Sequence, residues 1–429
     1  MYESTRSKTL IGFSEVAGYF KNLHNGFIEL GIDCGYINNN NFKFEYDYNI
    51  RGNSNFLNHY ISYASRYRKE PTLLRKILYV LFSLAVFIYV SIYYDNIIIA
   101  PNSSLLRKLD IVLFKFLGKQ IIYVSLGSDS RPPFLSGKYK DENDERFNLS
   151  EILDQSRRVK KSVEFYEKFS DYFVSYPQHL SFNNKSVING MCIGFPQPPF
   201  VLDNRNKQHK TYDVIRIIHA PSRPNAKGSK DIRRIIEELK REGFNIEFKE
   251  LRNSPNKKVL EELNKSDILV DELYSDLPLG GLGVEAACNK IPVVSCGYYQ
   301  LDKLKETSPE EIPPSLYIHP LELKDNLIKL CKSNSLRKQI GDSLFTFVSN
   351  HWSSKNIAAK YLQILNGQIN EKWKFGIDEI DYINGWGLSE NELVENLKQL
   401  YQYPGAIEFL RKSLNHTSLN QILLKIKNV

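Results

Sequence analysis

The stretch DVIRIIHAPSRPNAKGSKDIRRIIEEL, residues 213–239, decides the fold of this chain. It begins with a run of β-branched residues that is typical of a buried strand. It ends with a pattern typical of an amphipathic helix, because apolar residues recur at i, i+3, i+4 and i+7 from Ile232 to Leu239. The loop between them, His219 to Gly228, carries Arg, Lys and Ser. A strand, a basic loop and a helix in series predict a βα unit whose loop can hold an anion.

Further βα units lie on both sides of this stretch. We expect strands at 245–251, 268–272 and 291–296, separated by helices at 256–264 and 283–289. The first half of the chain contains continuous apolar strands, such as NIIIA and QIIYVS, which a parallel sheet covered on both faces requires. The predicted fold class is therefore α/β, with two Rossmann-like, doubly wound domains that face a cleft.

The domain boundaries follow from shifts in composition. Residues 1–195 form the expected N-terminal, acceptor-side domain, and the Pro-rich, then polar residues 196–212 form a linker. Residues 213–350 form the expected nucleotide-sugar-binding domain. Residues 351–429 are expected to be C-terminal helices, and the part from residue 367 is predicted to be helical throughout, with a capping box at Ser389 and Glu392. Whether this part packs across the two domains or contacts a partner is open.

Composition limits the classes of function. Of 429 residues, 42% are apolar and 25% are charged, and the formal net charge of +8 suits an anionic ligand or a membrane surface. No nucleic-acid recognition motif accompanies this charge, so no nucleic-acid partner is expected. Five cysteines without a CxxC pair predict a reducing, cytoplasmic location. The histidines have no metal-ligand spacing, so we expect no metal and no cofactor other than the substrate.

One uncharged stretch, ILYVLFSLAVFIYVSIYY at residues 77–94, is close to the length of about 20 residues that spans a bilayer. The favoured interpretation is a buried helix that leads into the next strand. A membrane-facing or spanning helix is the alternative. The basic cluster before it, from Arg66 to Lys76, could rest on anionic lipid at the inner face of the cell membrane.

The expected site lies at the carboxyl ends of the second domain's strands, where open α/β sheets bind ligands. Arg223 can hold a phosphate with two donors, and Lys227 adds a point charge. Gly280 and Gly281 let the backbone approach a ligand, and the helix behind them presents its N-terminal amides. Together these features predict a diphosphate site made without a metal.

Two segments of the second domain, HAPSRPNAKGSKDI and SDILVDELYSDLPLGGLGVEAACNKIPVVS, resemble the donor-binding half of GT-B glycosyltransferases, and of glycosyltransferase family 4 most of all. In the first domain, YDNIIIAPNSSLL and LGKQIIYVSLGSDSRP resemble the same family's acceptor domain. The resemblance covers roughly residues 94–365. It implies a retaining hexosyltransferase that moves a sugar from a nucleoside-diphosphate sugar to a glycan or polyprenyl-linked acceptor during surface polysaccharide biosynthesis.

The resemblance also assigns residues. Arg223 and Lys227 match the pair that binds the donor diphosphate, and Glu285 matches the acid that holds the nucleotide ribose. The expected donor site is completed by Ser222, Gly280, Gly281 and Leu282. In place of the family's other acid stands Leu277, so Asp276 or Glu272 would have to substitute.

The first domain supplies two further candidates. Asp129 and Arg131, in the loop GSDSR, are expected to orient the acceptor or the transferred sugar, and the alternative is that the two merely pair within the turn. Two other classes of function also fit: a GT-B-like epimerase acting on the nucleotide sugar itself, and a non-catalytic partner of another glycosyltransferase. His219 is expected to be structural.

Overall fold

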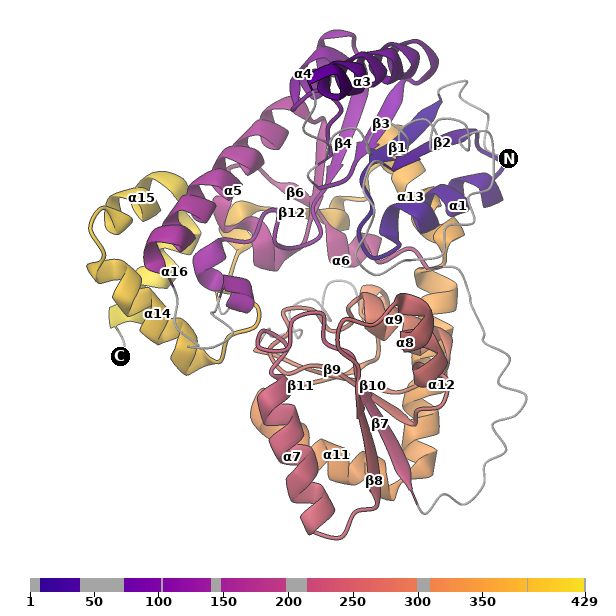
Figure 1. Ribbon diagram of the computed structural model, residues 1–429, viewed down its shortest axis with the longest axis vertical. Coiled ribbons are helices and arrows are strands. Elements are labelled where there is room, and N and C mark those ends of the chain that lie inside the picture. Colours follow the sequence, from indigo (N-terminus) through magenta and orange to yellow (C-terminus); the bar gives the residue numbers. More distant parts are fainter. Residues whose placement is uncertain are drawn as a thin grey trace.

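The computed structural model describes residues 8–38, 73–101, 103–139, 148–197, 214–298, 309–383 and 385–427. Two α/β bodies, one above the other in Figure 1, are joined by helices on one side. The expected linker, 196–212, lies outside the described residues apart from its first two.

The first domain is built on a sheet in the order β12-β6-β5-β4-β3-β1-β2. Its strands pair in parallel, except that β12 is antiparallel to β6. The strands are β1 (Thr9–Phe13), β2 (Cys34–Asn38), β3 (Asn96–Ile99), β4 (Gln120–Val124), β5 (Tyr172–Ser175), β6 (Val187–Asn189) and β12 (Lys374–Phe375). The helices of this domain are α1 (Tyr19–Glu29), α3 (Leu73–Tyr93), α4 (Leu109–Phe116), α5 (Leu149–Phe169) and α6 (Gly190–Ile193).

The second domain has a parallel sheet in the order β11-β10-β9-β7-β8. Its strands are β7 (Ile215–His219), β8 (Ile246–Glu250), β9 (Ile268–Glu272), β10 (Val293–Cys296) and β11 (Leu316–Ile318). Its helices are α7 (Ser229–Arg241), α8 (Asn256–Leu263), α9 (Gly281–Cys288), α11 (Leu323–Lys332) and α12 (Asn334–His351). β11 was not predicted. The strand order reverses between β7 and β9, and such a switch point is where doubly wound sheets bind ligands.

The two domains share a hydrophobic cluster, which runs from α1 through α13 (Ser354–Leu365) to α9. α13 leaves the second domain and packs on α1, and the hydroxyls of Tyr19 and Tyr361 lie 2.8 Å apart at this contact. Two Rossmann-like domains that face each other in this way form the GT-B arrangement, which confirms the predicted fold class.

The C-terminal segment belongs to the first domain in space. Three helices, α14 (Glu390–Gln402), α15 (Ala406–Ser413) and α16 (His416–Lys427), lie beside α5 in Figure 1. Leu393 and Leu397 enter the core of the first domain, and the Asn396 amide donates to the Phe134 carbonyl at 2.7 Å. The capping box of Ser389 and Glu392 is confirmed. The prediction that this part is helical throughout is wrong, because β12 extends the first sheet.

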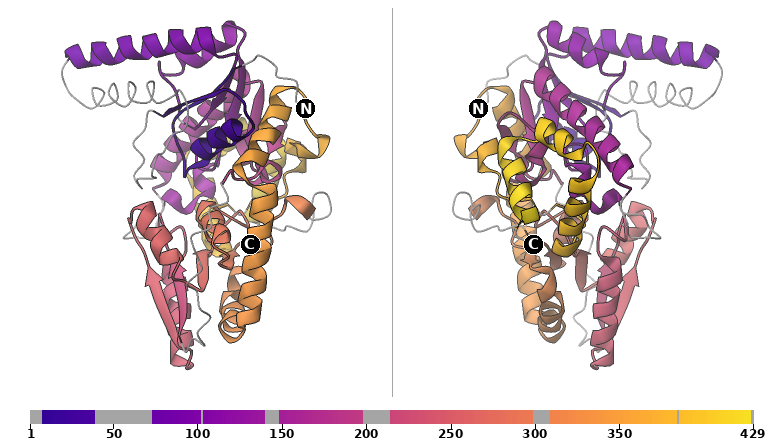
Figure 2. Two further views of the ribbon diagram at one scale, coloured as in Figure 1. Left: turned by 90° about the vertical axis from the view of Figure 1, so that its right-hand side faces the viewer. Right: turned by 90° about the vertical axis from the view of Figure 1, so that its left-hand side faces the viewer.

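α3 departs most from expectation. We predicted a buried helix, but large apolar side chains are exposed along most of its length, with Leu73 at 75%, Leu81 at 55% and Ile92 at 71% exposure. The side that packs on the domain is narrow and includes Val86, Phe87 and Val90. In Figure 2 the helix extends beyond the body of the domain. The segment Lys76–Tyr93 of this helix has a mean hydropathy of 2.0, and only 22% of it is buried. By length and composition, this segment could cross a membrane.

Candidate active site

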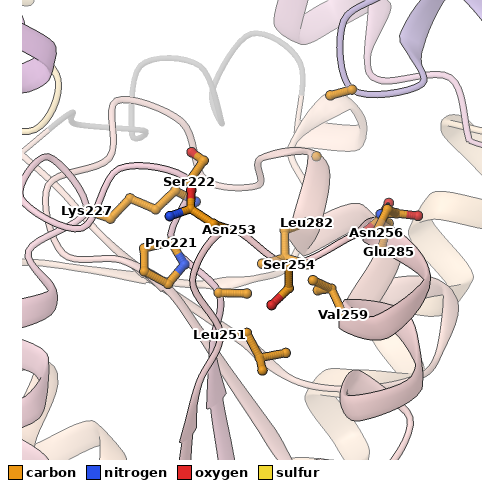
Figure 3. Close-up of a pocket in the computed structure, with 13 residues that line it drawn as sticks. Pro221, Ser222, Lys227, Leu251, Asn253, Ser254, Asn256, Val259, Leu282 and Glu285 are labelled. Atoms are coloured by element: carbon orange, nitrogen blue, oxygen red, sulfur yellow. The ribbon is translucent and has the colours of Figure 1, made fainter. Parts of the chain in front are cut away.

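A pocket of about 270 Å³ opens at the carboxyl edge of the second sheet (Figure 3). Its walls come from the loop after β7, the loop after β8, the start of α8 and the first turns of α9. Leu251, Val259 and Leu282 supply apolar surface, and Asn253 and Ser254 add polar groups. In Figure 3, Lys227 lies at one end of the pocket and Glu285 at the other. This order of apolar, acidic and cationic groups suits an elongated anionic ligand with a flat apolar part.

Glu285 is a half-buried carboxyl group on α9. It accepts a hydrogen bond from the Asn256 side chain at 2.9 Å. Burial raises the pKa of Glu285 to about 7, although the bond from Asn256 works in the opposite direction. A carboxylate with few donors around it readily accepts hydrogen bonds from a pair of ligand hydroxyls.

Lys227 is the cation at the other end of the pocket, and its residue is only 8% exposed. Its Nζ lies 2.8 Å from Asp271 Oδ1 and 2.9 Å from Glu272 Oε1, both at the end of β9. Burial alone would lower the pKa of Lys227, but these two carboxylates outweigh it and raise that pKa. An ammonium group has three N–H donors, so a phosphate oxygen in the pocket can be a third acceptor. The two carboxylates hold the side chain in place before a ligand arrives.

The Gly-rich turn before α9 also lies against the first domain. A Cβ on Gly281 would lie 3.4 Å from the Phe195 ring and 3.7 Å from Ala17, both in the first domain. A Cβ on Gly280 would lie 3.3 Å from the Asp271 carboxylate. The distances at Gly281 are ordinary van der Waals contacts, so the turn lies close to the first domain without needing a glycine there. Access of a ligand to the amides of α9 stays a prediction.

A second buried cation, Arg131, crosses the cleft. Its guanidinium bonds the carboxylate of Asp276 in the second domain and lies 2.6 Å from His179 Nε2. Burial would raise the pKa of Asp276, but Arg131 and His179 outweigh it and hold that pKa well below its usual range. The Gln178 side chain donates to the Asp276 carbonyl at 2.9 Å. Arg131 thus pairs across the domains and not, as the turn alternative required, with Asp129.

Asp129 serves its own loop. Its carboxylate accepts from the backbone N–H groups of Leu126 and Gly127, at 3.2 and 3.0 Å, and from the Tyr123 hydroxyl at 2.9 Å. These bonds fix the loop that presents Arg131. A role for Asp129 toward the acceptor stays a prediction.

The mouth of the cleft is basic. Lys138 lies close enough to Arg223 and Arg131 for both to lower its pKa, after burial as the largest cause. Arg223 is exposed and lies outside the pocket lining, whereas Ser222 and Lys227 line it. Of the predicted donor-site residues, the structure therefore brings Ser222, Lys227, Gly281, Leu282 and Glu285 together in one pocket.

Sequence reasoning missed three functional candidates: Lys138, His179 and Trp386. The indole Nε1 of Trp386 donates to Glu272 Oε2 at 2.6 Å, and the Arg131 guanidinium lies 5.3 Å from its ring centre. Nothing in the local sequence around Trp386 points to this position. For Lys138 the sequence did contain a signal, because this lysine follows Arg131 in the same basic loop.

The two acids that could substitute at the position of Leu277 lie apart in the structure. Glu272 pairs with Lys227, whereas Asp276 pairs with Arg131.

His219 is structural, as expected. Its two ring nitrogens lie 2.8 Å from the Val270 carbonyl and 2.8 Å from the Ser229 hydroxyl. Burial lowers the pKa of His219 to about 4, so the ring is neutral and ties β7 to the start of α7. Within the described ranges, no group of three or more His, Cys, Asp or Glu side chains has the geometry to hold a metal ion.

Comparison with known proteins gives solved structures only, since no family model and no curated protein matches this chain. MnaA of S. aureus, solved with UDP, is 13% identical; the match covers 85% of this chain and 98% of MnaA at a TM-score of 0.42. An alpha-glucosyltransferase bound to UDP and DNA is 12% identical, with 84% and 99% coverage and a TM-score of 0.47. HepE of Anabaena, solved with UDP, is 11% identical, with 84% and 100% coverage and a TM-score of 0.43. Likenesses this distant carry no argument about chemistry, which rests on the geometry above.

Proposed function

We propose that this chain is a glycosyltransferase that moves a sugar from a nucleoside-diphosphate sugar to a glycan or lipid-linked acceptor in surface polysaccharide biosynthesis. One observation carries the proposal: a single pocket holds a carboxyl group, Glu285, at one end and a preorganised ammonium, Lys227, at the other. A nucleoside diphosphate has hydroxyls and phosphates in that order. The apolar surface of Leu251 and Val259 suits the base.

The charges of the site suit the chemistry. When the bond between the anomeric carbon and the phosphate oxygen breaks, its electron pair stays on the diphosphate. The acceptor hydroxyl oxygen bonds to the anomeric carbon, and its proton passes to the departing diphosphate. Lys227 and the N-terminal amides of α9 would stabilise the new negative charge, since donors fixed in advance cost no reorganisation during reaction.

Two finer features of the proposal rest on the resemblance and on residue chemistry. Retention of the anomeric configuration is implied by the resemblance alone, and NMR of the product would test it. Independence from metal follows if Lys227 and the basic cleft mouth do the work of a cation, so turnover is expected to persist in EDTA.

A thermal-shift screen of nucleoside diphosphates and their sugars tests the binding step, because a specific ligand raises the melting temperature by mass action. We expect one nucleoside diphosphate to stabilise the wild type and to have no effect on Lys227→Ala. Failure of every compound to bind the wild type would rule the proposal out.

Product analysis separates the alternatives. A glycosyltransferase releases nucleoside diphosphate only when a suitable acceptor extract is added. An epimerase converts the nucleotide sugar without acceptor, and a non-catalytic partner does neither.

We further propose that the first domain rests on a lipid bilayer through α3 and α4. α4 packs on α3 through the rings of Phe87 and Phe114, which lie 4.9 Å apart, and it too exposes a large apolar side chain, Phe116, at 82%. α3 contains no acidic residue, Lys76 lies near its N-terminal end, and Lys119 follows α4 in the sequence. A helix of this kind suits an anionic membrane surface, where a lipid-linked acceptor would also lie. Of the expected basic cluster from Arg66 to Lys76, Arg75 and Lys76 belong to α3, and the other basic residues lie outside the described residues.

Flotation with vesicles of anionic or neutral lipid tests this second proposal. Leu81→Asp and Ile88→Asp place a charge on exposed positions and are expected to abolish flotation. Leu321→Asp is the matched control, because Leu321 is 86% exposed on the second domain. Equal loss in the control, or no flotation of the wild type, would contradict membrane docking.

A further inference from the structure

Residues Gly385–Leu388, hereafter the strap, run through the cleft between the two domains. The strap follows β12 and precedes α14, so it comes from the C-terminal segment that packs on the first domain. The backbone N–H of Trp386 donates to the Leu135 carbonyl at 3.1 Å, and the backbone N–H of Gly137 donates to the Trp386 carbonyl at 2.7 Å. Leu388 is fully buried in the core of the first domain. These bonds anchor the strap to the first domain.

The other side of the strap contacts the second domain. The Gly387 N–H donates to the Tyr274 carbonyl at 2.8 Å, and the Trp386 indole donates to Glu272. A Cβ on Gly387 would lie 2.9 Å from the Cβ of Ala226, the residue before Lys227. Because the strap is anchored to the first domain, a separation of the two domains would break these contacts.

Trp386 connects the two buried cations, because it contacts Arg131 directly and Lys227 through Glu272. Its indole N–H bonds Glu272, which in turn holds Lys227, and its ring lies beside the Arg131 guanidinium. We propose that Trp386 is a positioning residue that joins closure of the two domains to the placement of Lys227. This inference rests on the proposed function for its meaning, but its closure step does not depend on any ligand.

The physical reason lies in the surroundings of Glu272. The Glu272 carboxylate, which is 13% exposed, lies beside the buried Asp271 carboxylate, and two like charges in one site are unfavourable unless donors surround them. Opening the cleft removes the indole N–H from Glu272 and leaves the ammonium of Lys227 as its main donor. Lys227 is then drawn more tightly to Glu272 and away from the position in which it stabilises the charge that develops on the departing diphosphate. Closure shares Glu272 between two donors and leaves an N–H of Lys227 directed at that charge, so the effect falls on turnover and not on binding.

The first test uses the protein without ligand and follows tryptophan emission. The other tryptophans, Trp352 and Trp373, are buried at 5% and 6% exposure, whereas Trp386 is half-buried, so opening the cleft changes the environment of Trp386 above all. Gly387→Ala puts a methyl group against Ala226 and is expected to shift emission to longer wavelength. Small-angle scattering is expected to report a larger radius of gyration for the same variant.

Gly405→Ala is the matched control. Gly405 has φ +76°, almost the same as the +74° of Gly387, and a Cβ there would meet nothing within 4 Å. Both variants therefore carry the same backbone strain in the same C-terminal segment, and only Gly387→Ala adds the clash. Unchanged emission and scattering in Gly387→Ala, or equal changes in Gly405→Ala, overturn the proposal.

The second test measures turnover of the nucleotide sugar found in the screen, as release of nucleoside diphosphate. Trp386→Phe keeps an aromatic ring but loses the N–H, and we expect kcat to fall roughly 10- to 100-fold, as for misplacement of a catalytic group, with the Kd of the nucleoside diphosphate within about threefold. Trp373→Phe, in the same segment, is expected to keep wild-type kcat. A wild-type kcat in Trp386→Phe, or an equal loss in Trp373→Phe, overturns the proposal. If the wild type binds no nucleoside diphosphate, the proposed function fails, and the ligand-free comparison of Gly387→Ala with Gly405→Ala still decides the role of the strap.

Discussion

Lys227 and Arg131 are both buried cations in the cleft, but their partners come from different places. Lys227 is held by Asp271 and Glu272, which belong to its own domain, and it lines the pocket. Arg131 belongs to the first domain and is held by Asp276 of the second. A separation of the two domains would therefore leave the Lys227 pair intact and break the Arg131 pair. We infer that the first cation serves binding and the second serves closure.

Replacement of Lys227 is the strongest way to break this comparison. Lys227→Ala leaves two buried carboxylates without their cation and removes the phosphate donor. We expect a loss of turnover on the order of a hundredfold or more and a destabilisation of about 3 kcal/mol. Release of nucleoside diphosphate and urea unfolding measure the two effects. Lys338→Ala, an exposed position on α12 outside the pocket lining, is the control and is expected to change neither.

Replacement of Arg131 should separate closure from binding. Arg131→Ala removes the ion pair with Asp276, the strongest of several bonds to that residue across the domains, but touches nothing in the pocket lining. We expect turnover to fall roughly tenfold or more, while calorimetry gives a Kd for the nucleoside diphosphate within about threefold of wild type. Asp276→Asn, on the other side of the same bond, is expected to do the same. Loss of nucleotide affinity in both variants would show that the two cations are not divided in this way.

Much of the fold was predictable because its strands are continuous apolar runs and its helices are periodic. Ile232, Ile235, Ile236 and Leu239 all face the core, as their spacing required. The pairing of β12 with β6 was not predictable, because a two-residue strand has no pattern of its own. The exposure of α3 was also hidden, since a buried helix and a membrane-facing helix have the same apolar composition.

The candidate site was predictable only where its residues lie on one loop or on neighbouring strand ends. Lys227 and Glu285 fall into that class. The bond between Arg131 and Asp276 joins residues 145 positions apart, and the bond between Trp386 and Glu272 spans 114. Contacts at such separations come from tertiary packing, which local spacing does not encode.

A change of pH should act on the pocket and leave closure intact. Because burial raises the pKa of Glu285 to about 7, this carboxyl group is ionised at pH 8 and mostly protonated at pH 6. Ribose hydroxyls donate to the ionised form, so the affinity for nucleoside diphosphate should fall as pH falls, by about tenfold at pH 6. Calorimetry across this range measures it. In Glu285→Gln the side chain no longer titrates, so only the ligand's phosphates should still make the affinity depend on pH. An affinity profile identical to that of the wild type would contradict the assignment.

Replacement of a third cation, Arg223, should have the smallest effect on nucleoside diphosphate binding. It tests whether burial is what distinguishes Lys227 from an exposed cation. Arg223 is exposed at the mouth of the cleft, where water and salt screen its charge. Arg223→Ala is expected to weaken nucleoside diphosphate binding by about fivefold or less, and the difference should vanish in high salt. Titrations at low and high salt measure it beside Lys227→Ala, whose defect should persist. If Arg223→Ala is as damaging as Lys227→Ala in high salt, the arginine must enter the pocket with the ligand, and the division of roles would then depend on reach across the cleft and not on burial.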